Sequence, residues 1–225
     1  MMNGFFIAGT DTGVGKTWMT AALSHDLAER GLRVAGLKPL SCGGRETQDG
    51  WRHEDAELLM QTASVSLPYA TVNPYSLREP IAPHIAARHA DIRLTAANIA
   101  ASCRAVQGEL DCLLVEGVGG WEVPINEEET TADVACLLGY PVILVVGIRL
   151  GCLNHALLTR DAILSKQLKI AGWIANCIDP HMREVAENIA ALEARLPGPR
   201  LATVPHLSAF DAASIAGYLD TNEIV

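Results

Sequence analysis

Residues 9–17 read Gly9-Thr10-Asp11-Thr12-Gly13-Val14-Gly15-Lys16-Thr17 and follow a short apolar run at 5–8. The run predicts a buried strand, and apolar residues at helical spacing after the stretch predict a helix over 18–30. Glycines between a strand and a helix let successive backbone N–H groups point inward, and the helix N-terminus adds partial positive charge. Lys16 would reach the outer phosphates of a nucleotide, and Thr17 would bind its Mg²⁺. The stretch therefore predicts a phosphate-binding loop.

The stretch departs from the usual pattern at one position. The pattern G-x-x-x-x-G-K-[ST] places its first glycine at position 10, but Thr10 stands there and the glycine is Gly9. The alternative is an ordinary helix entry with a solvated lysine. The order of strand, glycines and helix favours the nucleotide-binding loop.

Composition narrows the class of protein. The chain has 225 residues, 49% of them hydrophobic, and a formal net charge of −9, which argues against nucleic acid as a main partner. Its six cysteines form no C-x-x-C pair, so neither a zinc site nor a disulfide framework is expected, and a reducing cytosol is the simplest location. No signal peptide and no membrane span are expected, because the apolar runs are short.

Apolar strand-like runs alternate with amphipathic stretches along the rest of the chain. Further strands are predicted at 33–37, 112–115, 141–147, 171–175 and 201–204, and further helices at 53–62, 95–107, 131–138, 153–165, 183–195 and 212–219. Residues 66–84 contain four prolines and are predicted to form a long irregular connection. Continuously apolar strands favour a parallel sheet covered by helices on both faces. We therefore predict an α/β fold, a single P-loop NTPase-like domain over 1–225 with a mostly parallel central sheet.

Polar residues follow several of these strands, at the edge of the sheet where such folds bind ligands. Lys38 ends the second strand and Pro39 keeps it extended, although an isolated lysine there could simply mark where a strand meets water. Glu116 ends an apolar strand before several glycines, as does a Walker B carboxylate that holds Mg²⁺. The amide of Asn176 could read the edge of adenine, or Asn176 could be an ordinary turn residue.

Other candidates have equally plain alternatives. Asp55 opens a predicted helix, and spacing alone favours a helix-terminal role for it. Residues 150–154 open a helix whose N–H groups would suit a carboxylate or phosphate. The seven histidines show no metal-ligand spacing, and Cys42 and Cys152 fit the role of small buried hydrophobic residues.

Several motifs, taken together, resemble the dethiobiotin synthetase family. They are the stretch 9–17, Gly36-Leu37-Lys38-Pro39, Thr71-Val72-Asn73-Pro74-Tyr75, Glu79-Pro80-Ile81-Ala82-Pro83-His84, Val115-Glu116-Gly117-Val118-Gly119-Gly120-Trp121, Pro141-Val142-Ile143-Leu144-Val145-Val146-Gly147, Leu150-Gly151-Cys152-Leu153-Asn154-His155 and Gly172-Trp173-Ile174-Ala175-Asn176. The resemblance runs in order over about residues 4–207.

The resemblance implies an ATP- and Mg²⁺-dependent cyclo-ligase of biotin synthesis that works as a cytoplasmic homodimer. Its substrates would be 7,8-diaminopelargonic acid, CO₂ and ATP, and its products dethiobiotin, ADP and phosphate, formed through a carbamate and a carbamic-phosphoric anhydride. Neither a nucleic acid nor a membrane is implied as a partner.

The resemblance also implies roles for individual residues. Lys38 would be the catalytic lysine, together with Lys16 of the loop, and Thr17, Asp55 and Glu116 would bind Mg²⁺. The expected nucleotide contacts are Gly13, Val14, Gly15, Lys16, Thr17, Trp18, Asp55, Glu116, Gly117, Val118, Gly119, Asn176, Cys177, Pro205, His206 and Leu207. The expected substrate contacts are Thr12, Ser41 and Cys42, with Gly151, Cys152, Leu153 and Asn154 of one subunit holding the substrate carboxylate at the partner's site.

One departure from the family lies at the substrate side. The family has Ser or Thr before the glycine that follows the Lys-Pro segment, whereas this chain has Cys42 there and Ser41 one residue earlier. Either Ser41 takes the role through a local shift, or the Cys42 thiol serves in its place. Beyond Leu207 the resemblance fades, and Asp211 is given no role.

The sequence disfavours two alternative functions. A partitioning-type nucleotide-switch ATPase would carry a lysine at position 11, where this chain has Asp11, and residues 211–225 contain no Lys or Arg for a basic membrane helix. An amide-forming ligase of the cobyrinic acid diamide synthase type would need a glutamine-hydrolysing domain, for which 225 residues are too few.

Overall fold

The structure is a computed structural model that describes residues 3–106 and 110–224. Its strands are β1 (Asn3–Gly9), β2 (Val34–Leu37), β3 (Leu40–Cys42), β4 (Arg45–Thr47), β5 (Gly50–Arg52), β6 (Tyr75–Leu77), β7 (Cys112–Glu116), β8 (Val142–Gly147), β9 (Ile170–Asn176) and β10 (Arg200–Val204). Its helices are α1 (Lys16–Glu29), α2 (Glu54–Thr62), α3 (Tyr69–Val72), α4 (Pro83–His89), α5 (Ala96–Arg104), α6 (Thr131–Leu138), α7 (Cys152–Ser165), α8 (Val185–Glu193) and α9 (Ala212–Ala216).

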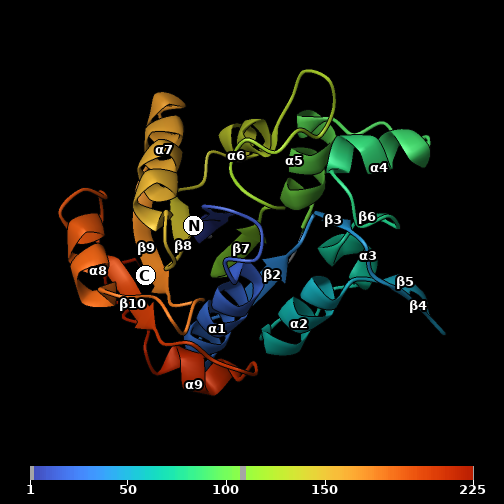
Figure 1. The fold of residues 1–225 in the computed structure, drawn as a ribbon. Coiled ribbons are helices and arrows are strands. Elements are labelled where there is room, and N and C mark those ends of the chain that lie inside the picture. The colour runs from blue at the N-terminus through green and yellow to red at the C-terminus, as the bar shows by residue number, and fades with distance from the viewer. Residues whose placement is uncertain (1–2, 107–109, 225) are drawn as a thin grey trace.

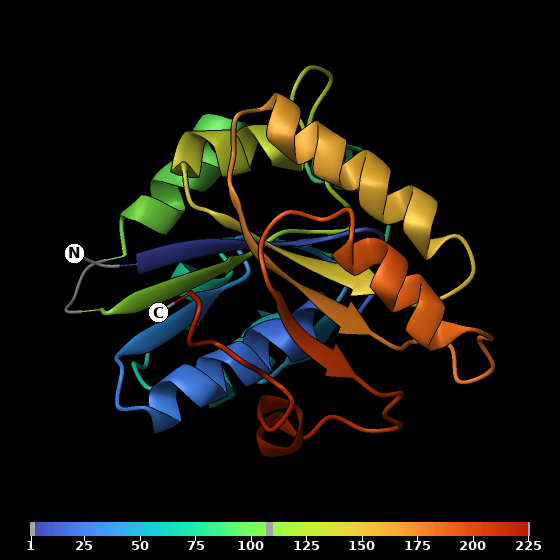
Figure 2. The same cartoon turned by 90° about the vertical axis from the view of Figure 1, so that its left-hand side faces the viewer.

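A parallel sheet lies at the centre of the molecule (Figure 1). Its six strands run in the order β10-β9-β8-β1-β7-β2, and every neighbouring pair is parallel. The first strand of the chain is therefore central, with β7 and β8 as its two partners. Figure 2 shows the sheet between two helical layers, with α1 and α9 on one side and α5, α6, α7 and α8 on the other. This confirms the predicted fold class.

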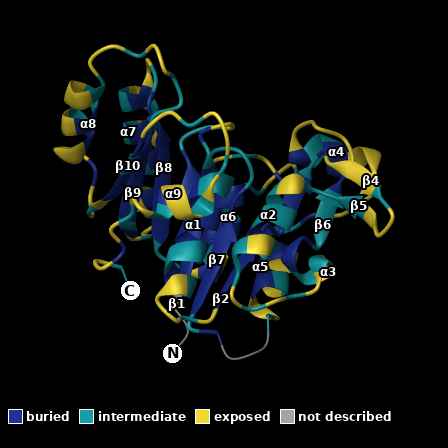
Figure 3. Ribbon diagram, turned by 90° about the horizontal axis from the view of Figure 1, so that it is seen from below, coloured by how far each residue is buried: buried dark blue, intermediate teal, exposed yellow. Residues whose placement is uncertain are grey.

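The apolar strands are buried on both faces, and β1 shows how the sequence achieves this. Phe6 and Ala8 pack into the core on one side of the sheet, whereas Phe5 and Ile7 pack into the core on the other. Successive side chains of a strand point to opposite faces, so a strand covered on both sides must be apolar at every position. The exposed segments lie outside this sheet, mainly in α8, α4 and the β4–β5 hairpin (Figure 3).

The prediction of a wholly irregular connection at 66–84 is wrong in part. The connection contains α3 and β6, and α4 begins within it at Pro83. Strand β6 pairs with β3 in a small separate sheet, and β4 pairs with β5 in a hairpin. The helix predicted at 95–107 ends at Arg104, and residue 107 lies outside the described residues.

Over residues 3–106 and 110–224, no helix is both long enough and apolar enough to cross a bilayer. The carboxyl ends of the parallel strands meet at one edge of the sheet, where β1 leads into residues 9–17, β2 into Lys38, β7 ends at Glu116 and β9 ends at Asn176. This edge carries the candidate site.

Candidate active site

The loop between β1 and α1 folds tightly because two of its glycines admit no side chain. A Cβ at Gly9 would lie 2.8 Å from Cγ2 of Val14, so a larger residue at position 9 would clash where the loop folds back on its first residue. Gly15 has a φ of 88° and directly precedes α1. Lys16 then folds back over the loop and donates from Nζ to the backbone oxygen of Asp11 at 3.1 Å. The result is a curled backbone with a buried lysine at a helix N-terminus, which is the geometry that binds phosphates.

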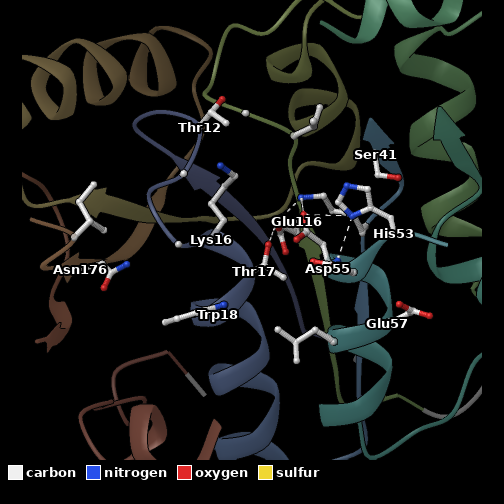
Figure 4. A pocket seen from close by; sticks show the side chains of 18 of the residues that line it. Thr12, Lys16, Thr17, Trp18, Ser41, His53, Asp55, Glu57, Glu116 and Asn176 are labelled. Atoms are coloured by element: carbon white, nitrogen blue, oxygen red, sulfur yellow. Dashed lines mark hydrogen bonds and ion pairs between the residues drawn. The ribbon is translucent and has the colours of Figure 1, made fainter. Parts of the chain in front are cut away.

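A second feature is a buried lysine held between the carboxylates of Asp55 and Glu116, which Figure 4 shows close to one another. Nζ of Lys38 lies 2.5 Å from Oε1 of Glu116 and 2.8 Å from Oδ2 of Asp55. The hydroxyl of Thr17 donates to the same Oε1 of Glu116 at 2.8 Å. Residues of α1, α2 and β7 and the lysine that directly follows β2 thus converge on one point.

The electrostatics of this cluster follow from burial and from its neighbours. Burial alone would lower the pKa of Lys38, but the facing carboxylates of Glu116 and Asp55 outweigh it and raise that pKa, so Lys38 is a cation. Burial would raise the pKa of Asp55, but Lys38 outweighs it and lowers that pKa. Burial and then the charge of Lys38 lower the pKa of Lys16 to about 8. The cleft therefore holds two lysine side chains beside the phosphate-binding loop, and one of them, Lys38, is paired with two carboxylates.

Two carboxylates and one hydroxyl fit a phosphate-bound Mg²⁺. Oε2 of Glu116 is buried and has no hydrogen-bond partner among the described residues, so it can accept a further cation. Clusters of three or more His, Cys, Asp or Glu side chains suited to a metal are absent from residues 3–106 and 110–224. Thr17, Asp55 and Glu116 could therefore hold Mg²⁺ only with oxygen ligands from elsewhere, and Mg²⁺ commonly takes these from nucleotide phosphates and water.

One continuous cleft of about 860 Å³ joins these groups. Most of the residues expected to bind nucleotide or substrate line it: Thr12, Gly13, Gly15, Lys16, Thr17, Trp18, Lys38, Ser41, Cys42, Asp55, Glu116, Val118, Gly119, Asn176, Cys177, His206 and Leu207. The lining residues do not include Val14, Gly117 or Pro205, and Val14 is buried beneath the loop. Gly151, Cys152, Leu153 and Asn154 also lie outside this cleft, at the start of α7.

The far end of the cleft has an aromatic wall. The amide of Asn176 donates from Nδ2 to the backbone oxygen of Val14 at 2.9 Å, which leaves Oδ1 as an acceptor. The indole of Trp18 lies on the same side of the loop, with its ring centroid 5.7 Å from that of Phe210. A flat apolar wall beside a hydrogen-bonding amide can take a heteroaromatic base.

The two candidate substrate residues on β3 differ in exposure. The hydroxyl of Ser41 is buried and donates to Oδ1 of Asn73 at 2.9 Å. Cys42 is partly exposed to the cleft, and burial raises the pKa of its thiol to about 11. Both residues line the cleft, and Cys42, a neutral thiol, is the more exposed of the two.

Sequence reasoning missed part of this wall. His53 caps α2, accepting at Nδ1 from the N–H of Asp55 at 3.2 Å, and its Nε2 lies 3.2 Å from the backbone oxygen of Cys42. The available signal was a histidine at the first position of the predicted helix 53–62, which in the structure is the residue that caps α2. The other lining residues that were missed are Arg45, Glu54, Glu57, Leu58, Gln61 and Ile178.

Comparisons with known proteins agree along the whole chain. A family model described as an AAA domain matches residues 3–214. The chain is 46% identical over 220 residues to ATP-dependent dethiobiotin synthetase BioD of Pseudomonas paraeruginosa, covering 97% of this chain and 96% of that relative. It is 45% identical over 221 residues to the protein of the same name from Cellvibrio japonicus, covering 98% and 97%.

Solved structures resemble the fold at lower identity. One of them is the septum site-determining protein MinD of Pyrococcus horikoshii OT3, complexed with Mg-ADP. Its TM-score is 0.60 at 18% identity, and the match covers 100% of this chain and 89% of the MinD chain. A ParA family ATPase from Chlorobium tepidum has a TM-score of 0.56 at 14% identity, covering 92% and 86%. At such identities the likeness concerns the fold alone.

Proposed function

The chain belongs to the dethiobiotin synthetase family, and on that premise we propose that it is an ATP- and Mg²⁺-dependent cyclo-ligase of biotin synthesis. It converts 7,8-diaminopelargonic acid, CO₂ and ATP into dethiobiotin, ADP and phosphate. Apart from family membership, the main support for the proposal is the cationic Lys38, which lies beside a phosphate-binding loop and contacts two carboxylates.

The first task of the site is to make an amine nucleophilic. An alkyl ammonium group has a pKa of about 10 and cannot attack CO₂ while it is protonated. Lys16 and Lys38 place positive charge in the same cleft and would lower the pKa of the substrate amine. The free amine then adds to CO₂, and the same two lysines favour the carbamate anion that forms.

The second task is phosphoryl transfer. A carbamate oxygen attacks the γ-phosphorus of ATP, ADP leaves, and a carbamic-phosphoric anhydride remains. The negative charge spread over the phosphoryl oxygens in this step is stabilised by Lys16 and Lys38, fixed before the reaction begins. Bound Mg²⁺ supplies further positive charge to the phosphates, and Thr17, Asp55 and Glu116 would hold it. The second amine finally attacks the carbonyl carbon, closes the ring and expels phosphate.

The nucleotide would lie along the loop, with its phosphates on residues 13–17 and the glycines after Glu116. Its base would lie beside Asn176 and Trp18, reaching the segment 205–207. Cys42 and Thr12 would contact the diamine substrate. These roles follow the family resemblance, and the cleft that joins most of these residues supports them.

We further propose that two copies form the working enzyme. The family resemblance implies that residues 151–154 would serve the partner's cleft, and their place outside the cleft of their own chain agrees with this role. Leu150 is 91% exposed and Leu158 is 62% exposed, so the start of α7 presents apolar side chains that a second subunit could cover.

We treat 1–225 as one domain, because both core clusters pack on the same sheet. We place the reaction in the cytoplasm, where ATP is available and the six free cysteines stay reduced.

The decisive experiment measures phosphate release from MgATP with bicarbonate, with and without 7,8-diaminopelargonic acid. Release that depends on the diamine, with an equal amount of dethiobiotin formed, is the expected result. Hydrolysis indifferent to the diamine would instead favour the nucleotide-switch ATPase, the less supported alternative.

A further inference from the structure

A short segment clamps the main chain at the catalytic lysine. The N–H of Lys38 donates to the backbone oxygen of Val72 at 2.9 Å, and the N–H of Tyr75 donates to the backbone oxygen of Pro39 at 3.1 Å. Between these two contacts, Nδ2 of Asn73 donates to the backbone oxygen of Lys38 at 2.5 Å. Hydrogen bonds from residues 72–75 therefore hold the Lys38–Pro39 segment on both sides.

Asn73 is a buried amide whose oxygen and nitrogen both have hydrogen-bond partners. Only 3% of it is exposed, and its Oδ1 accepts from the hydroxyls of Ser41 and Tyr69, each at 2.9 Å. The backbone oxygen of Lys38 can only accept, so it must face the amide NH₂, and the two hydroxyls then face the amide oxygen. The orientation of the Asn73 side chain is thus fixed by its partners.

The same network reaches the start of α2. The hydroxyl of Tyr69, while donating to Asn73, accepts from the N–H of His53 at 2.8 Å. His53 caps α2 and holds the N–H of Asp55, whose carboxylate contacts Lys38. The guanidinium of Arg52 lies 4.1 Å from the centre of the Tyr69 ring and packs over it. Figure 1 shows α3 lying beside α2 and β6 at this point.

One partly buried chain of hydrogen bonds therefore joins two main-chain segments that carry groups of the candidate site. It runs from the backbone oxygen of Lys38 through Asn73 and Tyr69 to the N–H of His53. Lys38 has a flexible four-carbon stem, so the position of its ammonium group depends on where its main chain is held and on the carboxylates that it meets. A displacement of about 1 Å at such a site can cost a hundredfold in rate.

We propose that Asn73 and Tyr69 are positioning residues that set the separation of Lys38 and Asp55 for the ligase reaction. The inference rests on the proposed function. Neither residue lines the cleft, so neither is assigned a contact with substrate. Their role is to hold the Lys38 ammonium group and the Asp55 carboxylate at a fixed separation. The Mg²⁺ site and the positive charge that stabilises the phosphoryl group then form together.

The test compares Tyr69→Phe with Tyr75→Phe in the full-length protein. Each change removes one phenolic hydroxyl, but no hydrogen bond to the Tyr75 hydroxyl occurs among the described residues, so Tyr75→Phe is the matched control. The quantities to measure are diamine-dependent kcat, KM for ATP, the Mg²⁺ concentration for half-maximal rate, and the thermal midpoint. A third variant, Asn73→Asp, keeps the acceptor for Ser41 and Tyr69 but loses the donor to Lys38.

We expect Tyr69→Phe to lower kcat by about tenfold and to raise the half-saturating Mg²⁺ concentration severalfold, with KM for ATP changed by less than about twofold. Asn73→Asp should lower kcat further, and Tyr75→Phe should behave as the unaltered protein. The proposal is overturned if Tyr69→Phe and Tyr75→Phe have equal kcat and equal Mg²⁺ dependence. It is also overturned if kcat falls only in step with the thermal midpoint while the Mg²⁺ dependence stays unchanged, because that pattern marks a purely structural role. If the unaltered protein itself shows no diamine-dependent turnover, the proposed function fails instead.

Discussion

At the scale of single residues, Lys38 is a buried cation whose Nζ lies within 2.8 Å of carboxylate oxygens of both Glu116 and Asp55. Lys38→Gln keeps a polar side chain, one atom shorter, but removes its charge. We expect the fold to survive and kcat to fall by at least about a hundredfold, the scale for one lost transition-state contact. Steady-state phosphate release in the presence of the diamine measures the effect.

The control for this variant is Lys169→Gln, the same change at an exposed lysine with no side-chain partner among the described residues. It should leave kcat unchanged. Normal turnover in Lys38→Gln would remove Lys38 from the mechanism, whereas loss of activity in both variants would point to an effect of net charge.

Gly15 offers a second test at this scale. It has a φ of 88°, and a Cβ there would lie 2.3 Å from Nδ2 of Asn176. Gly15→Ala should therefore weaken ADP binding by more than about tenfold, because both strain and the displaced amide distort the loop. Calorimetric titration with MgADP measures this.

Gly31→Ala is the matched control for Gly15→Ala. Gly31 has a φ of 83°, but a Cβ at this position would have no neighbouring atom within 4 Å, so the substitution brings the strain without the clash. It should lower stability by about 1 kcal/mol and leave ADP binding intact. Equal ADP affinity in Gly15→Ala and the unaltered protein would refute the steric argument.

At the scale of elements, α6 has a charged N-terminal turn that makes its stability depend on pH. The N–H of Thr130 donates to the carboxylate of Asp133 at 2.8 Å, and Lys166 lies 3.0 Å from the same group. Burial acts to raise the pKa of Asp133, but these contacts outweigh it and lower the pKa. A lowered carboxyl pKa stabilises the fold at pH values above the unfolded value of about 4, and this stabilisation is lost as the pH falls through the folded value.

Asp133→Asn should accordingly lower the free energy of unfolding by about 0.5 to 1 kcal/mol at pH 7, a small value because the pair is partly exposed and screened. The difference from the unaltered protein should vanish towards pH 3. Urea unfolding across this range measures it, with Asp49→Asn as a control on the exposed β4–β5 turn. A difference that stays constant with pH would contradict the assignment to the Asp133 charge.

The long elements could be predicted from sequence, and the short ones could not. Strands β7 and β8 are recognisable as continuous apolar runs, and α6 as a periodic stretch after Thr130. Strands β3 to β6 have three residues each, too few to show a period, and the partner of β3 lies in a distant segment, β6. The start of α4 at Pro83 did carry a signal, since proline is favoured in the first turn of a helix.

The candidate site likewise contains residues whose positions could be predicted from sequence and contacts that could not. The positions of Lys38 and Glu116 follow from rules about strand ends, so the sequence and the family resemblance predict that they lie close together. Ser41 and Cys42 could not be separated in sequence, because only the contact with Asn73 reveals which one is buried. The link from Tyr69 to His53 joins the first residue of α3 to the residue that caps α2 through a tertiary contact, and no local pattern predicts such a contact.

At the scale of the whole molecule, the proposed dimer gives a direct prediction. Leu158→Glu places a charge on the exposed apolar side of α7, and we expect it to weaken self-association by at least about tenfold and to lower turnover in parallel. Sedimentation velocity over a concentration series measures the association. Ile92→Glu, which changes another exposed aliphatic residue at 40% exposure, should leave both unchanged. A monomeric protein that is fully active would exclude the shared site.

The central place of β1 also bears on how the protein is made. Its partners β7 and β8 lie more than a hundred residues further along the chain, from Cys112 to Gly147. On a ribosome, the strand that carries the phosphate-binding loop is thus synthesised first but must wait for about two thirds of the chain before its neighbours exist. Pairings so distant in sequence are slow to form, and apolar strands without partners are prone to aggregate. Early emergence and late completion of β1 make the nascent chain a natural client for chaperones that shield exposed strands.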